Sequence, residues 1–118
     1  MLKFLINMTI KKKQKVAFVT GSSKGIGLSI AKLLDSKGIN VILNSRGKLN
    51  SKIYKNFSKK PLHLRFDISN SNKLEANLKK LKKIYGNIDY LICNVGFSTS
   101  SEKKQFEIKE WRMMFERN

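Results

Sequence analysis

The residues best suited to bind a ligand form a glycine-rich stretch near the N-terminus. This stretch follows the apolar run at residues 16–19, precedes a helical pattern at residues 28–34, and consists of Thr20, Gly21, Ser22, Ser23, Lys24, Gly25, Ile26 and Gly27. A strand, a glycine-rich turn and a helix in that order bring backbone N–H groups and a helix N-terminus to one point. The sequence therefore predicts a site for the pyrophosphate of a dinucleotide.

Each glycine of this stretch has a predicted role. Gly21 lets the chain leave the strand in a conformation that a β-carbon disfavours. Gly25 lets the backbone approach the phosphates, and Gly27 lets the helix pack closely on the strand. The spacing is G-x-x-x-G-x-G, not the G-x-G-x-x-G of the best-known dinucleotide fold. Because glycine-rich loops also occur for structural reasons, the prediction depends on the strand and helix that flank this one.

The string Thr-Gly-x-x-x-Gly-Ile-Gly resembles the cofactor signature of the short-chain dehydrogenase/reductase family. Three later segments resemble family motifs in the expected order: Asp67-Ile68-Ser69 after the third strand, residues 91–96 at the Asn-Asn-Ala-Gly stretch, and residues 110–118 in the helix that carries a catalytic asparagine. The resemblance covers about residues 15–118. It identifies the chain as the N-terminal, cofactor-binding part of a family member, truncated before the reaction centre.

The alternation of apolar runs with helical patterns predicts an α/β fold with a parallel sheet and helices on both of its faces. Strands are expected at residues 16–19, 41–43, 62–66 and 90–93, and helices at 28–34, 49–57 and 106–115. A further helix is expected between an N-cap at Ser71 and Gly86, which lies just past its end. The implied architecture is an incomplete, doubly wound Rossmann-type sheet of about four strands in the order 3-2-1-4. Residues 1–14 are expected to be a poorly ordered extension, with Met8 as an alternative start, and residues 15–118 a partial NAD(P)-binding domain.

Length and composition limit the possible classes of protein. The chain has 118 residues, enough for one domain, and lacks an apolar run long enough to span a membrane. A single cysteine, Cys93, fits a reducing cytoplasm. The net charge of +17 comes mostly from scattered lysines that no aromatic residues accompany. These lysines indicate solvated faces, and a basic nucleic-acid-binding protein is the less favoured alternative; no specific nucleic acid partner is expected.

The choice between NAD and NADP is predicted from the end of the second strand. An NAD site places a carboxylate there for the ribose hydroxyls, whereas a 2′-phosphate needs a cation. The residues here are Asn44, Ser45 and Arg46, without an acid, and Lys24 adds a second positive charge. We therefore expect NADP(H) to be favoured over NAD(H). The alternative is that Arg46 is an ordinary loop arginine.

The resemblance implies further contacts with the cofactor. Asp67, followed by Ile68, would accept a hydrogen bond from the adenine amino group, although a helix cap or turn is an alternative role. The adenosine ribose and the strand end would lie along Asn94, Val95 and Gly96. Cys93 replaces the first asparagine of the family motif, and we expect it to be a buried strand residue without nucleophilic function. The lone histidine, His63, has no partner pattern, so no metal site is predicted.

Catalysis in this family requires a tyrosine, a lysine four residues later that lowers its pKa, and a serine that polarises the carbonyl. None of the three tyrosines has a lysine at that spacing, and Asn118 is the only family catalytic position present. The resemblance implies an NADP(H)-dependent oxidoreductase of a carbonyl or alcohol, such as a 3-oxoacyl or sugar-keto group, homo-oligomeric when full-length. This chain alone is expected not to transfer hydride. A non-catalytic nucleotide-binding or interaction module is the alternative.

Overall fold

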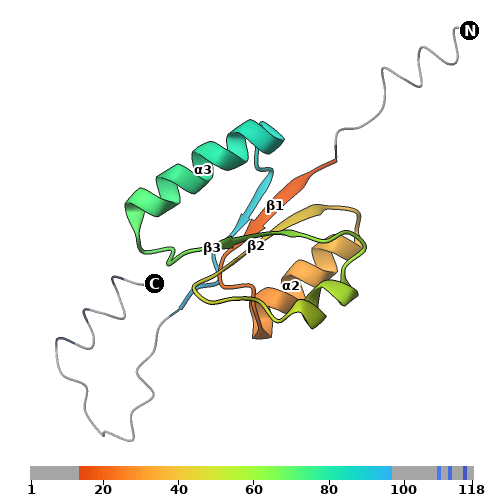
Figure 1. The fold of residues 1–118 in the computed structure, drawn as a ribbon, viewed down its shortest axis with the longest axis horizontal. Helices are drawn as coiled ribbons and strands as arrows, with labels where there is room; N and C mark the ends of the chain where they lie inside the picture. The colour runs from red at the N-terminus through yellow and green to blue at the C-terminus, as the bar shows by residue number, and fades with distance from the viewer. Residues whose placement is uncertain (1–13, 97–108, 110–111, 113–115, 117–118) are drawn as a thin grey trace, which may run out of the picture.

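The computed structural model describes residues 14–96 together with Lys109, Arg112 and Glu116 (Figure 1). The elements in chain order are β1 (Val16–Val19), α2 (Gly25–Ser36), β2 (Asn40–Ser45), η1 (Ser51–Asn56), β3 (Leu62–Arg65), α3 (Ser71–Tyr85) and β4 (Tyr90–Ile92). The four strands form one parallel sheet in the order β3-β2-β1-β4. The predicted fold class and strand order are confirmed.

The central strands, β1 and β2, carry apolar side chains on both faces of the sheet, as strands covered on both sides require. Phe18 and Ile42 pack with Leu81 of α3 on one face. Val19 and Leu43 pack with Ala31 of α2 on the other face, together with the partly buried Ile53 of η1. Figure 1 shows α3 and α2 on opposite sides of the strands.

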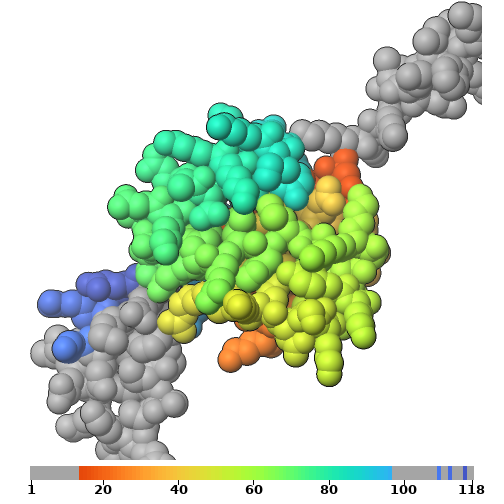
Figure 2. Space-filling model, in the orientation of Figure 1, coloured from red at the N-terminus to blue at the C-terminus, as the bar shows by residue number. Residues whose placement is uncertain are grey.

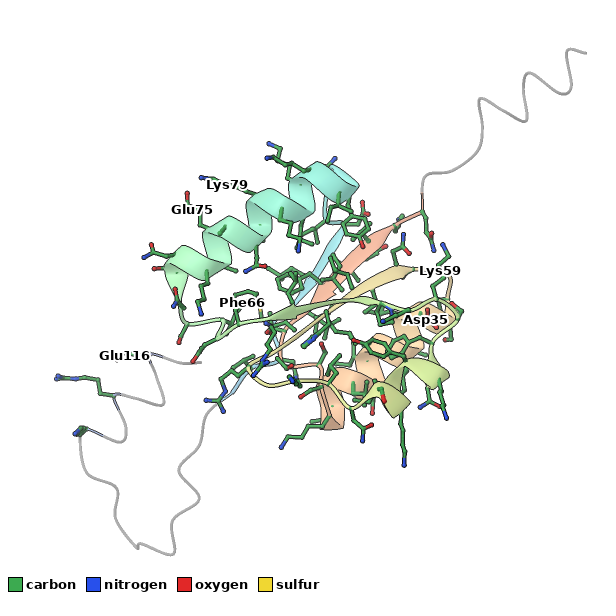
Figure 3. All side chains as sticks on the ribbon, in the orientation of Figure 1. Asp35, Lys59, Phe66, Glu75, Lys79 and Glu116 are labelled. Atoms are coloured by element: carbon green, nitrogen blue, oxygen red, sulfur yellow. The ribbon has the colours of Figure 1, made fainter. Side chains whose placement is uncertain are left out.

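Hydrogen bonds and packing fasten the outer segments to this core. Ser58, just after η1, donates from its backbone N–H and its hydroxyl to the carboxylate of Asp35 in α2, at 2.8 Å each. Phe66 is buried in the cluster that includes Leu81, and it lies between the sheet and α3 (Figure 3). In the space-filling view, atoms of α3 and of the segment around η1 cover much of the visible surface (Figure 2).

Several predicted boundaries differ from the structure. The third and fourth strands each end one residue earlier than predicted, at Arg65 and Ile92. The predicted cap Ser71 is instead the first residue of α3, and the N-cap is Asn70, whose side chain accepts a hydrogen bond from the Lys73 N–H. Asparagine and serine are both good caps, so their order in the sequence could not decide between them.

Two predicted segments fall largely outside the described residues. The expected N-terminal extension is described only at Gln14. Of the predicted helix at 106–115, only Lys109 and Arg112 are described, and both have helical backbone. Among the described residues, no helix combines the length and the apolar character needed to cross a bilayer.

The cap of α3 gives a first test of the fold. Asn70→Ala removes the acceptor for the Lys73 N–H, which is 3.1 Å away, and should lower the free energy of unfolding by about 1 kcal/mol. Asn72→Ala, on the exposed first turn of the same helix, is the matched control and should change it by less than about 0.5 kcal/mol. Urea unfolding followed by circular dichroism measures both. Equal effects of the two substitutions would contradict the assignment of the cap.

Candidate functional site

A cavity of about 270 Å³ lies at the carboxyl ends of the strands. In doubly wound sheets this edge is where ligands bind, because the loops that leave successive strands diverge there. Every strand supplies residues to the lining: Gly21, Ser23 and Lys24 after β1, Asn44, Ser45 and Arg46 at the end of β2, Phe66, Asp67, Ile68 and Ser69 after β3, and Asn94, Val95 and Gly96 after β4.

Gly21, at the bottom of the turn after β1, is held on both sides by asparagine side chains. Its N–H donates to Oδ1 of Asn44 at 3.3 Å, and its carbonyl accepts from Nδ2 of Asn94 at 3.1 Å. The φ angle of Gly21 is +59°, in the left-handed region that glycine favours. The two asparagines therefore tie the turn to the ends of both neighbouring strands.

Asn44 is a buried polar residue, only 2% exposed, and both polar atoms of its side-chain amide are hydrogen-bonded. Besides accepting from Gly21, it donates from Nδ2 to the carbonyls of Leu64 and Phe66, at 3.1 Å each. A buried amide is stable only when its hydrogen bonds are satisfied. Asn44 thus joins the turn after β1 to the end of β3.

Thr20 and Ser22, both predicted to bind the cofactor, are buried and hydrogen-bonded within the fold. The Ser22 hydroxyl donates to the Val19 carbonyl at 2.8 Å and accepts from the Asn44 N–H at 2.9 Å. The Thr20 hydroxyl donates to the Ile92 carbonyl at 3.3 Å and accepts from the Asn94 N–H at 3.0 Å. Neither residue lines the cavity, and their hydrogen bonds stabilise the turn from inside the fold.

The N-terminus of α2 differs from those of η1 and α3 in its capping. Asn70 and Asn50 accept hydrogen bonds from backbone N–H groups of α3 and η1, whereas Lys24 at the N-cap of α2 makes no capping side-chain bond. The first turn of α2 contains no acidic residue, as is also true of η1 and α3. Such a helix start leaves N–H donors and the positive end of the helix dipole for an anion.

Two glycines shape this helix start. Gly25 has φ +59°, and a Cβ added to it would meet no atom within 4 Å, so its requirement for glycine is conformational. A Cβ on Gly27 would lie 2.3 Å from the Gly21 carbonyl oxygen and 2.6 Å from Nδ2 of Asn94, so close packing excludes a side chain there. Gly25, Gly27 and the 72% exposed Ile26 were predicted site residues that do not line the cavity.

The charged residues of the lining are of both signs. Lys24 and Arg46 line the cavity from different loops, and β2 ends without a carboxylate. Asp67 also lines it, and its Oδ1 accepts from the N–H and the hydroxyl of Ser69 at 2.9 and 2.7 Å. The predicted turn-forming role of Asp67 is therefore present, in a residue that also faces the cavity.

The prediction that Cys93 is a buried strand residue is wrong. Cys93 is exposed and follows the end of β4. In the described part of the chain, β4 pairs only with β1, so nothing covers its outer side and Leu91 is 62% exposed. The next residues, Asn94, Val95 and Gly96, do line the cavity. Asn118, the predicted catalytic position, lies outside the described residues.

Three lining residues were missing from the predicted site: Asn44, Phe66 and Ser69. Asn44 was named only to show that no acid stands at the end of the second strand, and its burial with specific hydrogen-bond partners was not predicted. Phe66 was assigned to the strand and is instead the first residue after it, where the chain borders the cavity. Ser69 was quoted only as part of the motif that begins at Asp67.

His63 lies within β3, inside the strand that the sequence predicts, with its Nε2 atom 2.7 Å from the Ser45 hydroxyl. Burial, and to a smaller extent the nearby Arg65, lower the pKa of His63 below its usual value. Within the described part of the chain, no three His, Cys, Asp or Glu side chains gather in a way that could hold a metal ion.

The fold agrees with what comparison with known proteins shows. The family model for short chain dehydrogenases matches residues 15–118. The chain belongs to the short-chain dehydrogenase family. It is 30% identical over 107 residues to an uncharacterized oxidoreductase of Staphylococcus haemolyticus, covering 88% of this chain and 46% of that protein. It is also 30% identical over 105 residues to a 3-oxoacyl-[acyl-carrier-protein] reductase of Vibrio cholerae, covering 88% and 43%.

Solved structures give the same fold. The aldohexose dehydrogenase of Thermoplasma acidophilum, in ligand-free form, superposes with a TM-score of 0.71 at 28% identity, over 89% of this chain and 38% of that one. A 3-oxoacyl-[acyl-carrier protein] reductase from Brucella melitensis superposes with a TM-score of 0.77 at 22% identity, over 91% and 44%. The chain spans less than half the length of each of these dehydrogenases and reductases.

The amide of Asn44 should be essential for stability. Asn44→Ala removes the hydrogen-bond partner of the Gly21 N–H and of the carbonyls of Leu64 and Phe66. It should lower the free energy of unfolding by about 3 kcal/mol. Asn44→Asp, which keeps the shape but places oxygen against those carbonyls, should cost at least as much. The control Asn56→Ala, at the exposed end of η1, should cost less than about 0.5 kcal/mol. A near-wild-type Asn44→Asp protein would contradict this account.

The lowered pKa of His63 should make stability depend on pH. The fold favours the neutral imidazole, so below the unfolded pKa of about 6.5 the unfolded chain binds more protons than the folded one. The free energy of unfolding should therefore fall as the pH drops through that value, and this fall should be smaller in His63→Gln. Urea unfolding of both proteins at about pH 7.5 and pH 5 measures it. Identical pH dependence in the two proteins would contradict the prediction.

Proposed function

We propose that this chain forms the NADP(H)-binding part of an oxidoreductase that acts on a carbonyl or alcohol substrate. The observation that carries the choice of NADP is the charge at the end of β2. Arg46 lines the cavity at the end of β2, and Lys24 lines it from the turn after β1. No carboxylate stands at the end of β2 to accept hydrogen bonds from the hydroxyls of an NAD ribose. A guanidinium offers a planar set of donors that suits a phosphate.

The described residues fit the parts of such a cofactor. The uncapped start of α2 would hold the pyrophosphate, while Arg46 and Lys24 would hold the 2′-phosphate. Asp67 and Ile68 would lie at the adenine, and residues 94–96 along the ribose. A cavity of about 270 Å³ suits one part of a dinucleotide better than the whole molecule. When bound, NADPH supplies the hydride for reduction of a carbonyl.

The substrate class is proposed from two relatives. One is named as a 3-oxoacyl-[acyl-carrier-protein] reductase, and the other, from Formosa agariphila, as a 2-dehydro-3-deoxy-D-gluconate 5-dehydrogenase. Each is 30% identical to this chain. This chain spans less than half of either relative, and the role proposed for its described residues is cofactor binding.

One observation favours a second candidate, a nucleotide-binding module without turnover. None of the three tyrosines of the chain is followed four residues later by a lysine, the pair that the family mechanism uses for proton transfer. The two candidates differ in a single-turnover experiment with NADPH and a panel of keto substrates. Oxidation of NADPH by the 118-residue chain would support the enzyme, and tight binding without oxidation would support the module.

The choice of cofactor is tested at Arg46. Arg46→Ala removes charge-assisted hydrogen bonds to the 2′-phosphate and should weaken NADPH binding about tenfold or more, with NADH binding unchanged within about twofold. Isothermal titration calorimetry measures both affinities. Lys37→Ala, at the C-cap of α2 and away from the cavity lining, is the matched control for loss of one positive charge. Equal losses for NADPH and NADH would overturn the proposed role of Arg46.

A further inference from the structure

Two side chains of the neighbouring strand, β3, form hydrogen bonds with the loop that carries Arg46. His63 and Arg65 are alternate residues of β3, opposite Leu43 and Ser45 of β2, so both side chains project from one face of the sheet. The His63 ring lies 2.7 Å from the Ser45 hydroxyl, and Nε of Arg65 donates to the Arg46 carbonyl at 3.3 Å. Neither His63 nor Arg65 lines the cavity itself.

The direction of the hydrogen bonds at Ser45 follows from counting protons. The Ser45 hydroxyl lies 2.7 Å from the Gly47 carbonyl, which can only accept, so the single hydroxyl proton is donated there. His63 must then donate from Nε2 to the Ser45 oxygen. The result is a directed chain from His63 through Ser45 to Gly47, which spans the backbone on either side of Arg46.

These hydrogen bonds are important because the loop at residues 46–48 makes few packing contacts that could hold its conformation. Arg46, Gly47 and Lys48 are all exposed, and a Cβ added to Gly47 would meet no atom within 4 Å. A loop with open space around it and a glycine in it loses much conformational freedom when a ligand fixes it. Hydrogen bonds that fix the backbone beforehand reduce this cost.

We propose that His63 and Arg65 are positioning residues that set the preference for NADP(H) by holding the backbone of residues 45–47, and with it Arg46, ready for the 2′-phosphate. This inference rests on the proposed function, in which Arg46 recognises that phosphate. His63 and Arg65 act through Arg46 and do not touch the cofactor. The property they control is the ratio of NADPH to NADH affinity.

The test measures NADPH and NADH affinities of β3 variants by calorimetry, with thermal unfolding of each variant alongside. Arg65→Met keeps the length of the exposed side chain but removes its donors, and His63→Phe keeps a ring without a donor. Each should weaken NADPH about fivefold and leave NADH within about twofold. His63→Gln, which restores a donor, should return the ratio toward that of the wild type. A merely structural role would lower both affinities together.

The same substitutions in the Arg46→Ala background separate the possible outcomes. If Arg65 acts only through Arg46, Arg65→Met should not weaken NADPH further in that background. An equal loss in both backgrounds would show that Arg65 acts on the cofactor directly and would overturn the inference. If the β3 variants keep the wild-type ratio of NADPH to NADH affinity while Arg46→Ala changes it strongly, the positioning role of His63 and Arg65 is overturned and the proposed function stands. An unchanged ratio in Arg46→Ala would overturn both.

Discussion

The candidate site depends on how Gly21 is held between two asparagine side chains. Asn44 accepts from its N–H and Asn94 donates to its carbonyl, and each asparagine stands at or just beyond the end of a strand that neighbours β1. These bonds fix the direction in which the chain leaves the sheet. The positive φ of Gly21 and the absence of a side chain on Gly27 then let α2 begin directly against the turn. The contacts that tie the turn to the ends of β2 and β4 therefore also place the start of the helix, at Lys24, beside the cavity.

This arrangement divides the glycine-rich stretch into two groups of residues. The hydroxyls of Thr20 and Ser22 donate hydrogen bonds to backbone carbonyls inside the fold, whereas Ser23 and Lys24 line the cavity. A turn built in this way needs no ligand to satisfy its buried groups, since the asparagines and hydroxyls do so. The uncapped N–H groups of α2 are left for an anion.

Positive charge reaches the cavity from two loops: from the N-terminus of α2 with its N-cap Lys24, and from Arg46 after β2. Arg46 depends on β3, because His63 and Arg65 hold the loop around it. We therefore propose that two adjacent strands set the preference for a phosphorylated ribose. The residue that contacts the phosphate, Arg46, follows β2, and the side chains that hold its backbone come from β3. The overall charge of +17 adds a general attraction for anions that carries no such selectivity.

The sheet and its strand order could be predicted from the sequence because buried parallel strands are short apolar runs with helical patterns between them. The residues that follow each strand could be placed near the cavity for the same reason. The bonds of Asn44 could not be predicted, since its partners are backbone atoms of Leu64 and Phe66, about twenty residues away. Cys93 was misplaced because, among the described residues, β4 pairs only with β1 and Cys93 follows its end in an exposed position.

We propose that the turn held by Asn44 and Asn94 presents the start of α2, and that the loop after β2 presents Arg46, to a phosphorylated dinucleotide. Nuclear magnetic resonance titration of the ¹⁵N-labelled chain with NADPH tests it most directly, because each backbone N–H reports separately. The account predicts that the largest shifts occur at Gly25, Ile26 and Arg46, with small shifts on the exposed face of α3. Shifts spread over the lysines of α3, or none at all in a folded protein, would contradict it.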